Sequence, residues 1–303
     1  MKVSFTEDGH LYNSGDYLSV TTLIGKFENP FDQQFWSLYK AYERVLGEAE
    51  FKRVKKICNG FKSVTFWNYL REQVPDNIVQ HTRQLILDEW LQTNSDACEL
   101  GSKYHKQREI ISNILKKEIN PTTKKLFDTF VKKEDKSLPD NYTITDNLYN
   151  LPDGYYPELL IYNEEAKLAG QADKVFIETI RGVRYVDIDD YKTNKKITIE
   201  NKFASFLPPI QHIQESKFHL YELQLSLYAL MMEMFGYTVR YTCFHHYRPN
   251  LNNIFELQQQ YKTTYRKYEA QLLLQRAVHR DFPTPPLEPR PYVDPHLLKL
   301  PNT

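Results

Sequence analysis

The sequence predicts a mixed α/β fold in which a central β-sheet is flanked by helices. Residues 168–193 are rich in β-forming side chains and are interrupted once, at Arg181-Gly182, which predicts two strands joined by a tight turn. Apolar side chains recur at helical spacing over 31–133, and 219–236 is apolar on several helix faces. This order of elements indicates one domain rather than two independent ones.

Turn residues and periodicity divide the chain further. We expect an N-terminal hairpin and helical region over 1–140, a sheet-containing core over 141–281 and a Pro-rich extended tail over 282–303, forming one compact unit. Further strands are expected over 17–24, 155–162 and 239–247, and a further helix over 256–278. Within the helical region we expect breaks at Gly47, Gly60 and Pro75. New helices are expected to start at Ser95 or Asp96 and at Pro121.

Composition restricts the classes of protein to consider. The chain has 303 residues with 39 basic and 39 acidic side chains, so a nucleic-acid site has to be a local patch. No secretory signal opens the sequence and no apolar run approaches the about 20 residues of a membrane span, so we expect a soluble cytoplasmic protein without membrane contact. Cys58, Cys98 and Cys243 are too few for a four-thiolate iron–sulfur or zinc site and do not indicate a disulfide framework.

The hairpin over 168–193 carries the strongest candidate site. Asp190 and Lys192 share one face of their strand, because strand side chains alternate, and a hairpin can bring Asp173 beside Asp190. Two carboxylates this close repel unless a cation lies between them, which favours Mg²⁺ or Mn²⁺. Lys192 is placed to hold a water or an anionic oxygen. The alternative is a solvated Asp-x-Lys charge pair of little energetic value.

Further candidates flank this hairpin. Gly101 and His105 share a helix face, where glycine allows close approach of a backbone or DNA strand. His105 is either a metal ligand or a plain helix residue. The basic side chains nearby either form a solvated face or contact phosphates; they are Lys103, Lys106, Arg108, Lys195 and Lys196.

Two more positions complete the set. Glu158 lies in an apolar run, where a buried carboxylate is costly without a metal or a basic partner. Gln224 and Tyr228 are one helical turn apart, on one side of the 219–236 helix. They are either polar ends of side chains on a core helix or residues of the site.

In order along the chain, the Gly-x-x-x-His, Glu, Gly-x-x-Asp, Asp-x-Lys and Gln-x-x-x-Tyr elements resemble the PD-(D/E)XK nuclease superfamily, in its RecB-like and lambda-exonuclease-like branch. The resemblance implies a restriction-endonuclease-like core and a metal-dependent DNA exonuclease of the phage type, which a phage-encoded protein would place in the host cytoplasm. Its implied metal ligands are Asp173, Asp190, the carbonyl of Tyr191, His105 and Glu158. Lys192 would orient the attacking water, and Gln224 and Tyr228 would position Lys192 or the strand being cut.

Some features depart from the family or leave alternatives open. The four-cysteine cluster of some RecB-like nucleases is missing, so no iron–sulfur cluster is expected. Asp189 stands where the family has an apolar residue, so we expect that strand to be unusually exposed or kinked there, with Asp187 and Asp189 on the face opposite Asp190. The alternatives are a structure-specific endonuclease or a non-catalytic DNA-binding or virion-associated module. DNA is the expected partner, single-stranded or as duplex ends, and the oligomeric state is not indicated.

Overall fold

The computed structural model describes residues 5–6, 11–12, 15–118, 148–252, 254–284 and 290–299. The chain forms two compact units, one of 1–29 with 100–284 and one of 30–99 with 285–303. This division differs from boundaries at 140 and 281, because helix α5, Asp76–Glu118, contributes residues to both units and the C-terminal tail belongs with the helical one. Each unit is described separately below.

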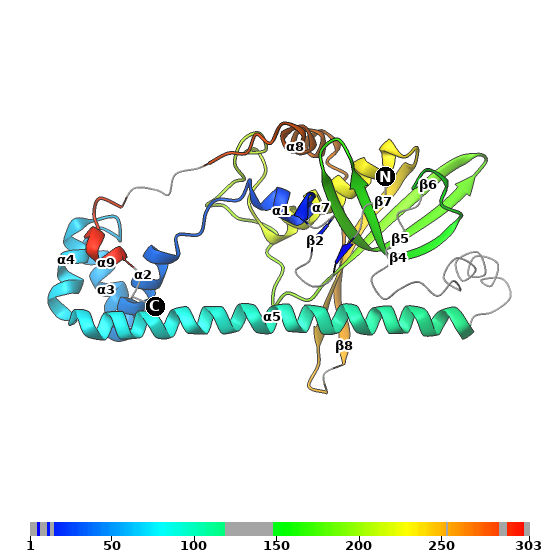
Figure 1. Ribbon diagram of the computed structural model, residues 1–303. Helices are drawn as coiled ribbons and strands as arrows, with labels where there is room; N and C mark the ends of the chain where they lie inside the picture. The colour runs from blue at the N-terminus through cyan, green and yellow to red at the C-terminus, as the bar shows by residue number, and fades with distance from the viewer. Residues whose placement is uncertain are drawn as a thin grey trace. The chain divides into compact units, whose positions relative to one another are not determined.

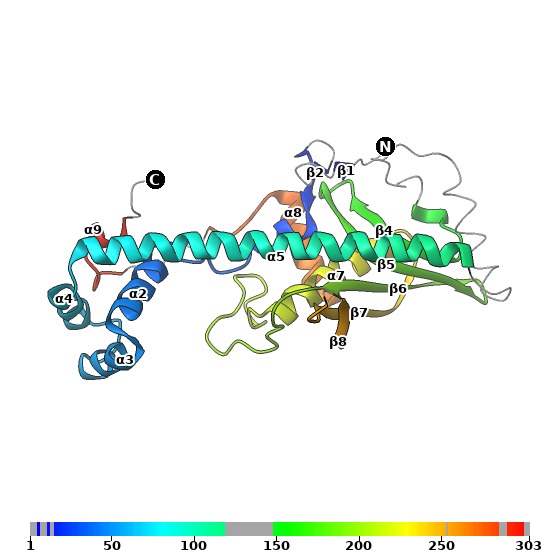
Figure 2. The same cartoon turned by 90° about the horizontal axis from the view of Figure 1, so that it is seen from below.

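Within the described part of the chain, six strands form the sheet of the first unit. They are β3 (Leu18–Ser19), β4 (Gly154–Asn163), β5 (Leu168–Ile180), β6 (Val183–Lys192), β7 (Thr238–Pro249) and β8 (Phe255–Thr263). Figure 2 shows β4, β5, β6, β7 and β8 following one another across this sheet. The β6–β7 and β3–β5 pairs are parallel and the others antiparallel, so the sheet is mixed and the predicted fold class is confirmed.

The hairpin expected over 168–193 is confirmed, with Arg181 and Gly182 as its turn. Both have positive φ, +51° and +82°, which a two-residue turn between twisted strands requires. The expected N-terminal hairpin is present as β1 (Phe5–Thr6) and β2 (Leu11–Tyr12), which pair antiparallel. A 3₁₀ turn, Leu148–Asn150, precedes β4.

The parallel β6–β7 pair needs a crossover, and α7 (Lys217–Met234) supplies it. Every residue from Tyr221 to Met232 is buried, which explains why the helix is apolar on several faces. Helix α7 contacts the sheet and also α1 (Val20–Gly25) and α8 (Lys267–His279), so it is enclosed between these elements (Figure 1).

Two expected elements differ from the structure. The strand expected over 17–24 is mostly helix α1, because Ser19 caps it by accepting the backbone N–H of Thr22 at 2.9 Å. The helix expected over 256–278 begins only at Lys267. Residues Phe255–Thr263 instead form β8, because pairing with β7 outweighs their local helical pattern.

The helical unit contains α2 (Gln33–Leu46), α3 (Glu48–Ile57), α4 (Val64–Gln73), the first part of α5 and α9 (Pro295–Leu298). The predicted breaks at Gly47, Gly60 and Pro75 all fall between these helices. A helix start at Ser95 or Asp96 was wrong: α5 is continuous there, and Asp96 accepts a hydrogen bond from Gln92 one turn earlier, at 2.7 Å. The helix expected from Pro121 lies outside the described residues. The described part of the tail contains a turn at 291–293 followed by α9.

Arg83 is a fully buried cation in the core of the helical unit. Its guanidinium donates to Ser37 Oγ at 2.9 Å and to the carbonyls of Gln34, Leu297, Leu298 and Lys299, so it joins α2 to the end of α9. Burial lowers the pKa of Arg83 to about 10, so the side chain stays charged at neutral pH.

Arg83→Met should therefore lower the free energy of unfolding of this unit by about 3 kcal/mol or more, because several buried carbonyls lose a charged donor. Urea unfolding measures the change. Arg53→Met is the matched control, since Arg53 is exposed and pairs with Glu50 at the surface, and it should cost no more than about 0.5 kcal/mol. Equal losses in the two variants would contradict this role of Arg83.

Among the described residues, no helix combines the length and apolar character needed to span a bilayer.

Candidate active site

The β5–β6 hairpin brings Asp173 and Asp190 together. The register pairs Lys174 with Asp189, which places Asp173 beside Asp190 at the next position, and their carboxyl groups hydrogen-bond to each other. Asp173 Oδ2 also accepts the backbone N–H of Tyr191 at 2.6 Å. Both aspartates are buried, with 7% and 2% of their surface exposed, so the predicted carboxylate pair lies away from bulk water.

Burial makes the pair electrostatically unequal. Burial and the negative charge of Asp190 raise the pKa of Asp173 well above its ordinary value. Burial also opposes ionisation of Asp190, but the ammonium of Lys192 and the hydrogen bond from Asp173 hold the pKa of Asp190 below its ordinary value. The pKa values of the two acids are therefore shifted in opposite directions, with Asp173 the weaker acid of the pair.

Lys192 lies against this pair. Its Nζ is 2.5 Å from Asp190 Oδ2 and donates to Gln224 Oε1 at 3.1 Å. Burial works against the charge of Lys192, yet the carboxylates of Asp190 and Asp173 raise its pKa, so it remains an ammonium. The side chain is only 16% exposed, so this is an enclosed cation and not the solvated pair of the alternative interpretation.

One face of α7 carries the residues that hold Lys192. Gln224 Nε2 donates to Tyr228 Oη at 3.3 Å, and Tyr228 Oη donates to the carbonyl of Gln171 on β5 at 3.0 Å. The predicted pair of Gln224 and Tyr228 is thus joined to Lys192 in one chain of hydrogen bonds. Sequence reasoning missed Tyr221, whose ring centroid lies 4.5 Å from Lys192 Nζ. The i, i+3, i+7 spacing of 221, 224 and 228 on one helix face was the signal that could have found it.

Gly170, the glycine of the Gly-x-x-Asp element, is required by this arrangement. A Cβ at Gly170 would lie 2.6 Å from Tyr228 Cε1 and 2.7 Å from Tyr228 Oη. Only a residue without a side chain lets the tyrosine ring approach β5 closely enough to bond the carbonyl of Gln171. Gly101 differs, because a Cβ there would meet Thr193 Oγ1 at an ordinary 3.7 Å, so no described contact demands glycine.

Gly170→Ala should displace Tyr228 and, through Gln224, loosen Lys192. If the site has the nuclease activity that the motif order implies, kcat for DNA cleavage should fall by about 10-fold or more, since small displacements of positioned groups are costly. Tyr228→Phe is the matched control, because it removes the hydroxyl without a clash. Both variants are measured in single-turnover cleavage together with a melting temperature. A Gly170→Ala protein that melts and cuts like the wild type would contradict the packing argument.

His105 and Glu158 complete the site from two other elements. His105 Nδ1, on α5, lies 3.4 Å from Asp173 Oδ1 and 3.7 Å from Glu158 Oε1. Glu158 lies opposite Asp173 between β4 and β5 and has a φ of +49°, which is uncommon for a residue with a side chain. Its side chain is 38% exposed, so Glu158 is not a fully buried carboxylate, and it faces His105 at the site.

The donor set fits a hard divalent cation. The ligand atoms of His105, Glu158 and Asp173 all lie within 4.8 Å of one another. Neighbouring ligands of an octahedral Mg²⁺ are about 3 Å apart, slightly closer than the 3.4 and 3.7 Å measured here. Within the described residues, Asp190 Oδ2 has no hydrogen-bond partner of good geometry although Lys192 Nζ is 2.5 Å away, so this buried oxygen retains a lone pair for a cation. Tyr191 meets Asp173 through its N–H, and a role for its carbonyl stays a prediction.

The basic residues proposed to contact DNA fall into two groups. Lys103, Lys106, Lys195 and Lys196 are exposed, as a phosphate-binding surface requires. Arg108 is half-buried instead. Its guanidinium lies 4.9 Å from the ring centroid of Tyr191 and 5.7 Å from that of Tyr247, and it donates to Tyr191 Oη at 3.3 Å. In this structure Arg108 therefore anchors α5 to the sheet.

Asp187 and Asp189 lie on the sheet face opposite Asp190, as strand alternation predicted. Asp187 pairs with Arg240, and Asp189 pairs with Lys174 at 3.2 Å. The expectation that the strand is exposed at Asp189 was wrong, because only 4% of Asp189 is exposed. The carboxylate of Asp189 is therefore stabilised by its polar partners on that face and not by solvent.

Comparison of the chain with protein-family models, with curated proteins and with solved structures finds no match.

Proposed function

We propose that this protein is a metal-dependent DNA nuclease that acts as an exonuclease on DNA ends. The observation that carries the proposal is the buried pair of Asp173 and Asp190 with the enclosed ammonium of Lys192 against it. Buried like charges beside a cation are costly to maintain and are characteristic of sites that perform chemistry. The resemblance in motif order supports DNA as the substrate and ends as the point of attack.

Each residue has a role that its contacts support. Asp173, Glu158 and His105, whose ligand atoms converge, would hold Mg²⁺ or Mn²⁺ together with the unsatisfied Oδ2 of Asp190. The metal would lower the pKa of a bound water and polarise phosphate oxygens. Lys192 would stabilise the negative charge that develops on the phosphate in the transition state. Gln224 and Tyr228 hold the ammonium in place, because both are buried: Gln224 accepts from Lys192 and donates to Tyr228, and Tyr228 donates to the β5 backbone.

Exposed lysines would supply the affinity for DNA. The chain has no net charge, so attraction to phosphates has to come from local groups such as Lys103 and Lys106 on α5 and Lys195 and Lys196 after β6. These four residues flank the elements that carry His105 and Lys192. Neutralising them should weaken binding without altering the rate of cleavage of bound DNA.

The enclosed position of Lys192 favours catalysis over a binding-only module. A lysine that serves only to bind phosphate gains most when its ammonium is open to the duplex, whereas Lys192 is 16% exposed and fully engaged by Asp190, Gln224 and Tyr221. A structure-specific endonuclease would use the same residues, and the form of the DNA substrate separates it from an exonuclease.

The test uses purified protein, end-labelled linear duplex and single-stranded DNA, and closed circular DNA, each with Mg²⁺, Mn²⁺ or EDTA. Degradation of linear DNA alone, with metal, is the expected result. Nicked or linearised circles would show an endonuclease. No cleavage of any substrate under all conditions, with DNA retained in a binding assay, would overturn the nuclease and leave the binding module. Asp173→Asn, prepared in parallel, controls for contaminating nucleases.

A further inference from the structure

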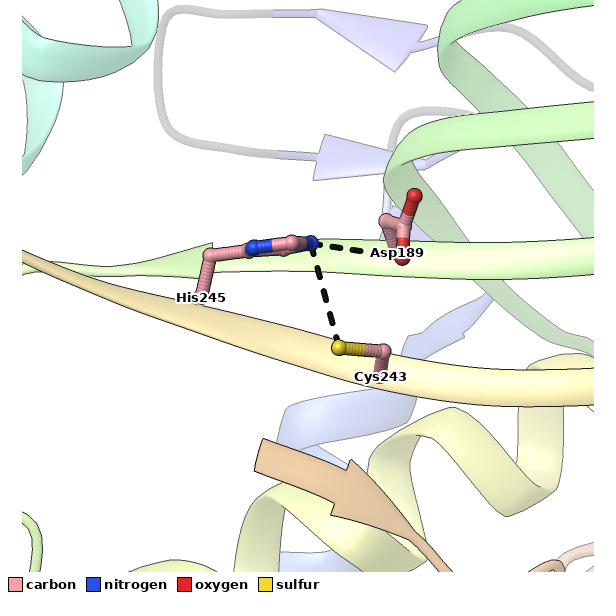
Figure 3. Close-up of side chains that lie close together, drawn as sticks. All are labelled: Asp189, Cys243 and His245. Atoms are coloured by element: carbon pink, nitrogen blue, oxygen red, sulfur yellow. Dashed lines mark hydrogen bonds and ion pairs between the residues drawn. The ribbon is translucent and has the colours of Figure 1, made fainter. Parts of the chain in front are cut away.

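A second cluster of potential metal ligands lies on the other face of the strand that carries Asp190. Asp189 and Asp190 are consecutive in β6, so their side chains point to opposite faces. Asp189 pairs in parallel register with Cys243 on β7, and Cys243 and His245, two residues apart, share that face. Figure 3 shows the three side chains converging between the two strands.

The geometry of this cluster is that of ligands around one point. His245 Nε2 lies 3.4 Å from Asp189 Oδ1 and 3.8 Å from Cys243 Sγ, and all three atoms are within 4.8 Å of one another. Both contacts use the same ring nitrogen (Figure 3). A Cys-His-Asp nucleophilic triad needs the acid and the thiol on different ring nitrogens, so that the histidine can be oriented by one and take a proton from the other. The arrangement therefore excludes a triad.

We propose that Asp189, Cys243 and His245 form a zinc site. In a tetrahedral zinc site the bond lengths of about 2.0–2.3 Å place neighbouring N and O ligands about 3.3 Å apart and N and S ligands about 3.6 Å apart. The measured 3.4 and 3.8 Å from His245 Nε2 are within about 0.2 Å of these separations, and Asp189 Oδ1 and Cys243 Sγ lie within 4.8 Å of each other. One thiolate, one imidazole and one carboxylate suit Zn²⁺ better than Mg²⁺, which avoids sulfur.

The surrounding residues support the ligands. Lys174 Nζ contacts Asp189 Oδ2 at 3.2 Å, so the other oxygen, Oδ1, faces His245. Tyr241 Oη donates to Oδ1 at 3.0 Å. Gln260 Nε2 donates to Cys243 Sγ at 3.3 Å, so an amide N–H supports the sulfur atom. Outer hydrogen bonds of this kind orient ligands and strengthen metal binding.

An ion can reach the site, because His245 is partly exposed although Cys243 and Asp189 are buried. Bound there, it would cross-link β6 to β7 one residue away from Asp190. The site is separate from the carboxylate pair, since it lies on the opposite face of the sheet and uses none of its side chains.

Cobalt is the probe, since Co²⁺ occupies zinc sites and reports a thiolate ligand through a sulfur-to-cobalt charge-transfer band. Protein is stripped with a chelator, reduced, and titrated with Co²⁺ and then Zn²⁺ in excess Mg²⁺. We expect a charge-transfer band that saturates at an equimolar ratio and is bleached by Zn²⁺. A wild-type protein that shows no such band would overturn the proposal, whatever the behaviour of any variant.

Variants identify the residues that produce the charge-transfer band. Cys243→Ser and His245→Gln should abolish it, whereas Cys58→Ser, which removes another buried thiol in the helical unit, should leave it intact. Tyr241→Phe, which keeps all three ligands, should weaken zinc affinity by about 10-fold or more. Asp173→Asn should not affect the band. A band that survives Cys243→Ser but disappears in Cys58→Ser would also overturn the assignment.

Discussion

Lys192→Ala should lower kcat for DNA cleavage by about 10²-fold or more while changing DNA affinity little. The ammonium lies 2.5 Å from Asp190 Oδ2 in an enclosed position, where it can stabilise charge that appears only in the transition state. Single-turnover cleavage and a binding titration, run on the same preparations, separate the two effects.

Lys192→Arg should not restore the rate. A planar guanidinium is wider than an ammonium and would have to enter the space bounded by Gln224 and the Tyr221 ring. Lys195→Ala is the matched control, because Lys195 is exposed and close in sequence. It should weaken DNA binding modestly and reduce the salt slope by about one unit, with normal cleavage of bound DNA. If Lys192→Ala behaved like this control, the catalytic assignment would be wrong.

Asp173→Asn should abolish metal-dependent cleavage and leave the fold intact. The amide keeps a similar shape and can still accept the N–H of Tyr191 and donate to Asp190, but it offers no charge to a metal. Because the pKa of Asp173 is raised, a metal must displace its proton, so metal affinity and activity of the wild type should rise with pH. Isothermal titration with Mn²⁺ in buffers of different ionisation enthalpy measures the proton released.

The same variant, unfolded in EDTA so that no metal is bound, tests how the free energy of unfolding depends on pH. The pKa of Asp173 is higher in the folded protein than the ordinary value of 3.8 expected in the unfolded chain. Asp173 therefore contributes its full stabilisation below about pH 3.8, and this stabilisation is lost as the pH rises through the pKa of the folded state. The wild type should therefore lose free energy of unfolding relative to Asp173→Asn as pH rises. Urea unfolding at several pH values gives the difference. A difference that does not change with pH would mean that Asp173 is not the group that holds the proton.

Local patterns in the sequence were sufficient for the hairpin and most of the site. Strand alternation placed Asp190 and Lys192 on one face, the Arg181-Gly182 turn placed Asp173 beside Asp190, and helical spacing joined Gln224 to Tyr228. These relations depend on neighbours within one or two elements, where backbone geometry alone sets which side chains meet. For the same reason the breaks at the glycines and at Pro75 were predictable.

Features that depend on pairing between distant segments were not predictable in this way. Residues 255–263 have a helix-like pattern but form β8, because β7 offers a free edge, and the expected helix start at Ser95 or Asp96 is absent because α5 continues through it. Local propensity is a weak guide wherever tertiary contacts supply more free energy.

The sequence alone was enough to establish the mixed α/β class and the acids and lysine of the hairpin, since periodicity and turn chemistry act over short range. Three-dimensional packing decided the rest. It set the left-handed backbone at Glu158, the approach of Tyr228 over Gly170, and the burial of Asp189 beside Cys243 and His245. Each of these arises from contact between residues far apart in the chain, whose proximity depends on how the whole sheet and its helices pack.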